Sequence, residues 1–278
     1  MIVERKISDE VIKKVKNTNK IILLYGARQV GKTTLAKDII SKLGLKTLFI
    51  NADEQKYNDI LSSRALDRIE SLVSGYQLVF IDEAQRITDI GLNLKIMVDG
   101  LPSLKIIATG SSSFELANKV SESLTGRAWT FNLYPLAVCE LKKLYNEFEL
   151  KSKLDDLLVF GGYPEVFTTV NHREKQNLLE EIGRSYLYKD ILELATVKHS
   201  SKIKDLLKLL AFQIGSEVSI NELSNSLNIS RDTTERYMDL LEKSFVIFRL
   251  KGFSRNLRKE VTKMDKIFFY DLGIRNIV

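Results

Sequence analysis

Five short apolar runs alternate with helix-like segments over the first half of the chain. They cover residues 21–24, 46–51, 77–82, 104–110 and 128–134. Runs of this length between turn residues are typical of buried strands, and apolar residues spaced three or four apart between them indicate helices. Such alternation predicts an α/β domain, a parallel sheet with helices on both faces. A short amphipathic helix is expected before it, within residues 1–19.

The pattern becomes helical beyond Pro135. Residues 136–150 and 154–160 are amphipathic, and the glycine-containing turn at 161–165 separates them from a helical stretch at 174–194. We interpret this region as a small helical lid beside the sheet.

The last part of the chain fits a winged helix. Ser219 and Glu222 form a capping-box pattern that starts one helix, and Arg231–Lys243 is the next helix of a helix-turn-helix. Two β-like runs, 245–250 and 266–270, would supply the hairpin. The predicted division is therefore a sheet domain over 1–145, a lid over 146–200 and a winged-helix domain over 201–278.

The loop after the first apolar run matches the phosphate-loop pattern G-x-x-x-x-G-K-[ST] at every fixed position. The predicted nucleotide-binding residues are Gly26, Ala27, Arg28, Gln29, Val30, Gly31, Lys32, Thr33 and Thr34. Glycines let the main chain come close to a phosphate, and the amides at a helix start bind the anion. Lys32 is expected to reach the β and γ phosphates, and Thr33 to ligate Mg²⁺.

Two adjacent carboxylates, Asp82 and Glu83, follow the third apolar run. An aspartate at the tip of a strand beside a phosphate loop can hold magnesium, directly or through water, and the next residue can polarise an attacking water. We assign Asp82 to the metal and Glu83 to the general base. The alternative is an ordinary capped turn between strand and helix.

Small polar residues end the fourth run. Thr109 or Ser111 would help to hold the attacking water, unless they only cap the helix expected from Phe114. Ser111 is included in the predicted nucleotide site.

Arg127 precedes the fifth run and is the candidate arginine finger. An arginine delivered to the γ phosphate, from its own chain or from a neighbouring subunit, stabilises transition-state charge. The alternative is a surface arginine paired with an acidic neighbour.

Composition excludes several other classes. With Cys139 as the only cysteine, an intrachain disulfide is impossible, and we expect this residue in the core. The two histidines, His172 and His199, lack the spacing of a zinc site. No run approaches the ~20 apolar residues of a membrane span, so we expect a cytoplasmic protein without a membrane partner.

Basic residues near the carboxyl end raise the possibility of a nucleic-acid partner. Arg231 and Arg236 lie on the second helix of the helix-turn-helix, and Arg255, Arg258, Lys259 and Lys263 follow it. These side chains would contact DNA phosphates. An accessory module that packs on the sheet domain, or on a protein partner, explains the segment equally well.

With these motifs in place, the chain resembles a family of archaeal and bacterial AAA+ ATPases whose nucleotide site opens with Gly-x-Arg-Gln-x-Gly-Lys-Thr-Thr. Further segments that carry the resemblance are residues 80–85, 109–112, 124–127 and 161–165. The resemblance implies an AAA+ core, a preference for ATP, and a winged-helix segment. In longer relatives a restriction-endonuclease-like domain follows at about residues 271–276. A nuclease is therefore not expected here, whether the chain is truncated or naturally lacks that domain.

The function expected from the sequence is Mg²⁺-dependent ATP binding and hydrolysis coupled to conformational change, with DNA or a protein as target. A homo-oligomer is a further expectation, because a finger such as Arg127 can act between subunits. The alternative function is a nucleotide-gated DNA-binding switch with slow or no turnover.

Overall fold

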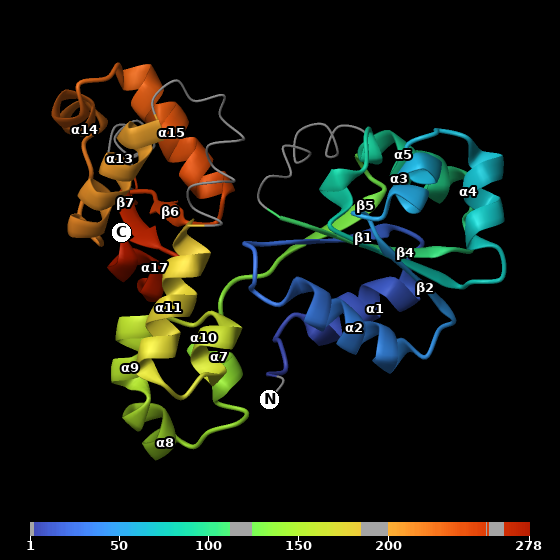
Figure 1. Ribbon diagram of the computed structural model, residues 1–278, viewed down its shortest axis with the longest axis horizontal. Coiled ribbons are helices and arrows are strands. Elements are labelled where there is room, and N and C mark those ends of the chain that lie inside the picture. Colours follow the sequence, from blue (N-terminus) through green and yellow to red (C-terminus); the bar gives the residue numbers. More distant parts are fainter. Residues whose placement is uncertain (1–2, 112–123, 185–199, 254, 256–263) are drawn as a thin grey trace. The chain divides into compact units, whose positions relative to one another are not determined.

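The computed structural model describes residues 3–111, 124–184, 200–253, 255 and 264–278 (Figure 1). The chain folds as two compact units, residues 2–133 and residues 134–278. The first unit ends before the boundary expected at residue 145. The expected lid and winged-helix domain both fall in the second unit, and their separation stays a prediction.

The amino-terminal unit is built on a five-stranded parallel sheet in the order β2-β3-β4-β1-β5. The strands are β1 (Ile21–Tyr25), β2 (Thr47–Asn51), β3 (Leu78–Asp82), β4 (Lys105–Gly110) and β5 (Ala128–Asn132). Each of the five apolar runs is a strand, so the predicted α/β class is confirmed. The register pairs Tyr25 with Gly110, and Asn51 with Asp82, so the carboxyl ends of the strands share one edge.

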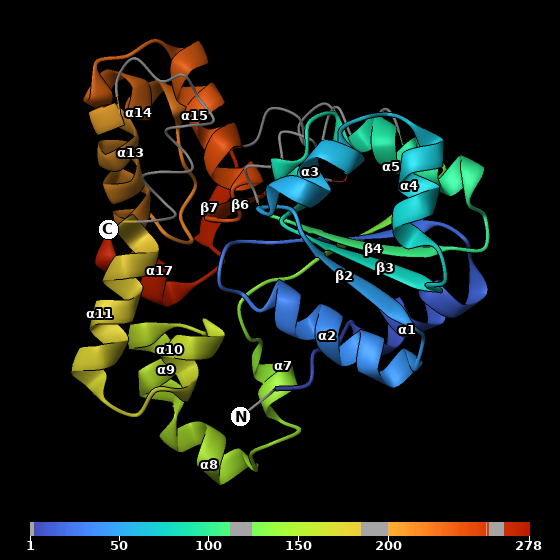
Figure 2. The ribbon, with the colours of Figure 1, turned by 45° about the vertical axis from the view of Figure 1, so that its right-hand side comes forward.

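Helices cover both faces of this sheet, which explains why its strands are apolar almost throughout. In Figures 1 and 2, α1 (Ser8–Asn17) and α2 (Lys32–Leu43) lie on one face. The other face carries α3 (Gln55–Leu61), α4 (Leu66–Val73) and α5 (Ile90–Gly100). Side chains such as Ile81 and Leu94 form the core on that second face, both with 0% exposure.

The carboxyl-terminal unit begins with short helices. They are α7 (Val138–Leu141), α8 (Glu147–Ser152), α9 (Leu154–Phe160), α10 (Pro164–Thr168) and α11 (His172–Ile182). The amphipathic stretch 136–150 is therefore two helices rather than one. Cys139 lies in the first of them and is exposed, so its expected place in the core is wrong. The short helix α7 buries Glu140 and Leu141 and leaves Cys139 facing solvent.

Further helices and a two-stranded antiparallel sheet follow in the order that the sequence predicts. The elements are α13 (Ser200–Phe212), α14 (Ile220–Leu227), α15 (Arg231–Lys243), β6 (Ile247–Leu250), β7 (Lys266–Phe269) and α17 (Leu272–Ile277). Ser219 caps α14 by accepting a hydrogen bond from the Glu222 amide, as its pattern predicts. Arg258, Lys259 and Lys263 lie outside the described residues, so the winged-helix assignment stays a prediction.

No helix among these described elements is long and apolar enough to cross a membrane.

A buried carboxylate ties α17 to the Gly161–Gly162 turn. Asp271 is 5% exposed, and its side chain accepts hydrogen bonds from the amides of Gly162 (2.7 Å) and Ile274 (3.0 Å). A Cβ at Gly161 would lie 2.1 Å from the Asp271 carboxylate, and Gly161 has φ +76°. This turn therefore requires glycine, because the carboxylate occupies the space of a side chain.

Burial raises the pKa of Asp271 to about 6, although the hydrogen bonds from these amides act in the opposite direction. A carboxyl whose pKa is higher in the folded than in the unfolded state binds its proton more tightly when folded. The free energy of unfolding should therefore fall as the pH rises from about 4 to about 6, by up to about 3 kcal/mol.

We expect Asp271→Asn to remove this pH-dependent loss, as measured by urea unfolding followed by far-UV circular dichroism between about pH 4 and pH 7. The fluorescence of Trp129, the only tryptophan, reports the amino-terminal unit and serves as the internal control. An unchanged slope in the variant would show that another group titrates.

Candidate nucleotide site

The phosphate loop connects β1 to α2 at the shared edge of the sheet. Gln29 and Gly31 have left-handed backbones, with φ of 61° and 93°, and Gly31 is the residue from which α2 starts. A Cβ on Gly26 would lie 2.2 Å from the carbonyl oxygen of Leu133, just after β5. Gly26 is therefore required by the packing of the loop against the segment after β5 of the same chain, a constraint that sequence reasoning did not identify.

Lys32 is held against the loop that precedes it. Its side chain is almost fully buried, and Nζ donates hydrogen bonds to the carbonyls of Gly26 (3.0 Å) and Ala27 (2.8 Å). The ammonium group thus lies at the start of α2, where the helix amides and the helix dipole also favour an anion.

The two predicted metal ligands meet across the sheet edge. The Thr33 hydroxyl lies 3.0 Å and 2.9 Å from the two carboxylate oxygens of Asp82, at the end of β3. Thr109, on β4, also donates to Asp82. One hydroxyl and one carboxylate next to a phosphate loop form the partial, all-oxygen ligand set that Mg²⁺ uses when waters and phosphates complete its coordination. The residues present therefore fit magnesium.

Glu83 follows in a strained conformation and takes part in a second set of hydrogen bonds. Its φ is +54°, and its amide donates to the Thr109 hydroxyl at 3.0 Å. Gln85 lies in the 3₁₀ turn η1 (Ala84–Arg86) and donates from Nε2 both to the Glu83 carboxylate and to Ser111 Oγ, at 3.2 Å for the latter. Ser111 is thus linked to Glu83 through Gln85, and its part in nucleotide binding stays a prediction. The part played by Gln85 was missed, although Gln85 is the last residue of the segment 80–85 that carries the family resemblance.

Arg5 is a second residue that sequence reasoning missed. It precedes α1, is 7% exposed, and donates from Nη1 to the Val30 carbonyl at 3.0 Å. A buried guanidinium group therefore supports the phosphate loop from outside. An isolated arginine 21 positions before Gly26 gives no sequence signal of this contact.

Arg127 lies at the opposite edge of the sheet. Its carbonyl accepts a hydrogen bond from the amide of Ile21, the first residue of β1, at 2.9 Å. The phosphate loop begins five residues later, roughly 16 Å along the strand. Nε of Arg127 donates to Asp99 Oδ1 at 2.7 Å, and this side chain is 38% exposed. The structure therefore does not bring Arg127 to the phosphate loop of its own chain.

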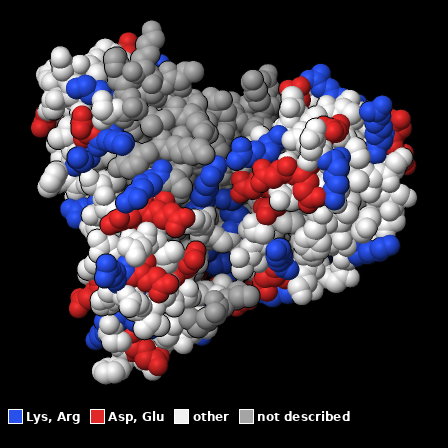
Figure 3. Space-filling model, viewed as in Figure 1, with Lys and Arg blue, Asp and Glu red and all other residues white. Residues whose placement is uncertain are grey.

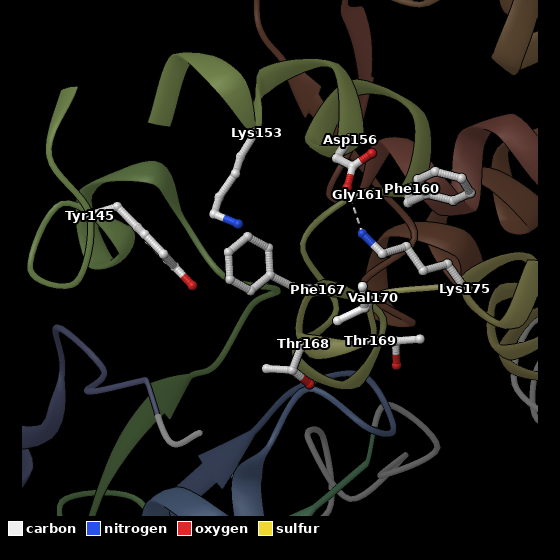
Figure 4. Close-up of a pocket in the computed structure, with 10 residues that line it drawn as sticks. All are labelled: Tyr145, Lys153, Asp156, Phe160, Gly161, Phe167, Thr168, Thr169, Val170 and Lys175. Carbon is white, nitrogen blue, oxygen red and sulfur yellow. Dashed lines mark hydrogen bonds and ion pairs between the residues drawn. The ribbon is translucent and has the colours of Figure 1, made fainter. Parts of the chain in front are cut away.

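A separate cavity of about 240 Å³ lies in the carboxyl-terminal unit (Figure 4). Its two lysines are both engaged. Lys153 lies over the Tyr145 ring, 4.8 Å from the ring centroid, and Lys175 pairs with Asp156 at 2.7 Å. The two lysine charges of this cavity are therefore matched by aromatic rings and by a carboxylate.

The sequence of this chain is similar to known protein families and to known proteins. Residues 18–142 match the family model of the AAA domain, and residues 151–278 match a domain of unknown function (DUF8612). Uncharacterized proteins of Mycobacterium tuberculosis and Methanocaldococcus jannaschii are each 28% identical to this chain over 276 residues. The alignments cover 99% and 91% of this chain but 59% and 61% of those proteins, so the chain spans about three fifths of their length.

A solved structure shares the fold. The Walker-type ATPase of Pyrococcus abyssi superposes with a TM-score of 0.61 at 16% identity, covering 99% of this chain and 95% of that one. The AAA-domain match, the strand order and the shared fold together indicate that residues 18–142 form an AAA domain with the fold of a P-loop ATPase.

Proposed function

We propose that the protein binds ATP with Mg²⁺ and hydrolyses it. The observation that carries this proposal is the contact of Thr33 with Asp82 at 2.9 Å, beside the Lys32 ammonium group at the start of α2. These groups supply a phosphate cradle, a point charge and oxygen ligands for a metal within one edge of the sheet.

Each residue of the site then has a distinct role. The loop amides and Lys32 bind the phosphates, and Thr33 and Asp82 hold the metal directly or through water. The metal supplies neutralisation of phosphate charge. Glu83 lies one residue beyond Asp82 and serves as the base that takes a proton from the attacking water.

Two substitutions separate binding from turnover. Lys32→Ala should weaken Mg·ATP binding, because it removes the buried cation at the loop. Glu83→Gln should bind Mg·ATP normally and lose roughly 10²–10⁴-fold in kcat, the usual contribution of a general base. Calorimetry measures the first and phosphate release the second. Normal turnover in both variants would refute the proposed site.

Arg127 is proposed to act on the nucleotide of a neighbouring copy. It is exposed, it points to an acidic partner on its own chain, and it cannot reach its own phosphate loop. If Arg127 left Asp99 and contacted the γ phosphate of a neighbouring copy, its guanidinium group would gain a stronger charge-assisted hydrogen bond.

Arg127→Ala should therefore lower kcat on the order of a thousandfold with little change in Mg·ATP affinity. The specific activity of the unmodified protein should rise with protein concentration. Mixing Arg127→Ala with Lys32→Ala should restore activity, because one chain supplies the loop and the other supplies the arginine. If the mixture stays inactive and the activity is independent of concentration, Arg127 has only a structural role.

The contacts of Leu133, where the chain passes from the first unit to the second, support a coupling of hydrolysis to conformational change. Leu133, the last residue of the amino-terminal unit, donates from its amide to the Tyr25 carbonyl at 2.7 Å. Its own carbonyl closes the space beside Gly26. A shift of the phosphate loop on nucleotide binding would therefore act directly on the chain segment that leads to the second unit.

For the target we propose a protein rather than DNA. The helix α15 carries three basic and four acidic residues, a net charge of −1. Its Arg231 pairs with Glu235 at 3.0 Å, and Arg249 on β6 pairs with Glu242 at 2.7 Å. In Figure 3 basic and acidic side chains are interspersed over the described residues of each unit. Phosphate binding requires cations that are available to the ligand, and on this helix acidic residues outnumber basic ones.

Duplex DNA should accordingly fail to bind at about 50 mM salt, where electrostatic binding is strong, with or without Mg·ATP. Fluorescence anisotropy of a labelled duplex measures this. DNA binding that weakens steeply with salt and changes with the nucleotide would instead support the DNA-binding switch. The basic residues that follow β6 in the sequence would then be the candidates for the DNA contact.

A further inference from the structure

Gln85 connects two strand ends of the candidate site through a single amide group. Its Nε2 donates one hydrogen bond to the Glu83 carboxylate, after β3, and one to Ser111 Oγ, after β4, at 3.2 Å. Ser111 is fully buried. Because both donor positions of the NH₂ group are used, the side chain is fixed with its nitrogen toward Glu83 and its carbonyl oxygen turned away from these two partners.

That carbonyl oxygen has no matching donor. Oε1 of Gln85 is buried and accepts no hydrogen bond from the described protein atoms. A buried acceptor without a donor is unfavourable, and such atoms are commonly satisfied by an ordered water. In this case the acceptor belongs to the side chain that also holds the base.

A water molecule that attacks phosphorus needs both of its hydrogens held elsewhere. Only then does one of its lone pairs point at the phosphorus atom, and correct orientation of this kind contributes much of the rate of a positioned reaction. Gln85 binds one carboxylate oxygen of Glu83 and leaves the other to accept the first hydrogen. Oε1 of Gln85, buried and accepting no hydrogen bond from the described atoms, is the acceptor left for the second.

We propose that Gln85 is a positioning residue that orients the Glu83 carboxylate and the attacking water. The proposal rests on the hydrolysis proposed above. In that reaction the water oxygen bonds to the γ phosphorus, and the bond from phosphorus to the β–γ bridging oxygen breaks. The electron pair of this bond leaves with the nucleoside diphosphate, and one proton of the water passes to the Glu83 carboxylate. Ser111 fixes the amide, so the loop after β4 influences the base through Gln85.

The first test compares two variants with a matched control. Gln85→Ala removes both hydrogen-bonding ends, and Gln85→Glu keeps the size but places a second carboxylate beside Glu83. Both should lower kcat roughly hundredfold while the KM and the Mg·ATP dissociation constant stay within about twofold. Arg86→Ala, in the same turn, removes an exposed side chain that pairs with Asp53 and should retain the unmodified kcat.

The second test shows whether Gln85 acts through Glu83. In a Glu83→Gln background, Gln85→Ala should lower kcat by less than about threefold, because residues that act as a unit are not additive. If Gln85 had only a structural role, the kcat loss of the double variant would instead equal the product of the two single-variant losses. Circular dichroism and the Trp129 fluorescence of each variant establish that it is folded.

The outcomes separate this inference from the proposed function. Mg·ATP binding without any phosphate release by the unmodified protein overturns hydrolysis itself. Turnover by the unmodified protein that Gln85→Ala leaves unchanged overturns the role of Gln85 alone. Parallel losses in KM and kcat, or full multiplication with Glu83→Gln, also overturn it.

Discussion

The candidate site depends on the hydrogen bonds that the Asp82 carboxylate accepts. This carboxylate accepts hydrogen bonds from Thr33 at the start of α2 and from Thr109 on β4, so one side chain joins three separate segments of the chain. A carboxylate that accepts several hydrogen bonds is held strongly in one orientation. The positions of Glu83 and Gln85 follow from it, because both extend from the same strand end.

The parallel sheet makes this joining possible. After each strand the chain returns through a helix to the edge of the sheet where the next strand starts. The residues that follow β1, β3 and β4 therefore come together, although they are far apart in sequence. The same geometry sends Arg127, which precedes β5, to the other edge. One sheet therefore carries the phosphate loop at one edge and the partly exposed Arg127 at the other, and the proposed sharing of sites between copies rests on this arrangement.

The carboxyl-terminal unit uses a buried carboxylate in a different way. Asp271 fills the space that a side chain at Gly161 would occupy, and it accepts hydrogen bonds from the Gly162 and Ile274 amides. The Gly161–Gly162 turn, which the sequence marks as a break between helices, thus binds the residue that precedes α17. Its glycines serve the packing of this unit.

The sequence by itself determined the fold class, the five strands and the phosphate loop, because these are local properties: apolar runs of strand length, helical spacing, and glycines at fixed intervals. It also predicted a shared site for Thr33, Asp82 and Ser111 from their places beside these runs and the phosphate loop, and their roles stay predictions. Only the tertiary structure decided which distant residues meet them. Arg5 on Val30, Leu133 against Gly26 and Gln85 between Glu83 and Ser111 are contacts across the sheet or between its connections, and no periodicity along the chain records them. The sequence records that Arg127 precedes the fifth run, but only the strand order shows that β5 lies beside β1, with Arg127 at the edge away from the phosphate loop.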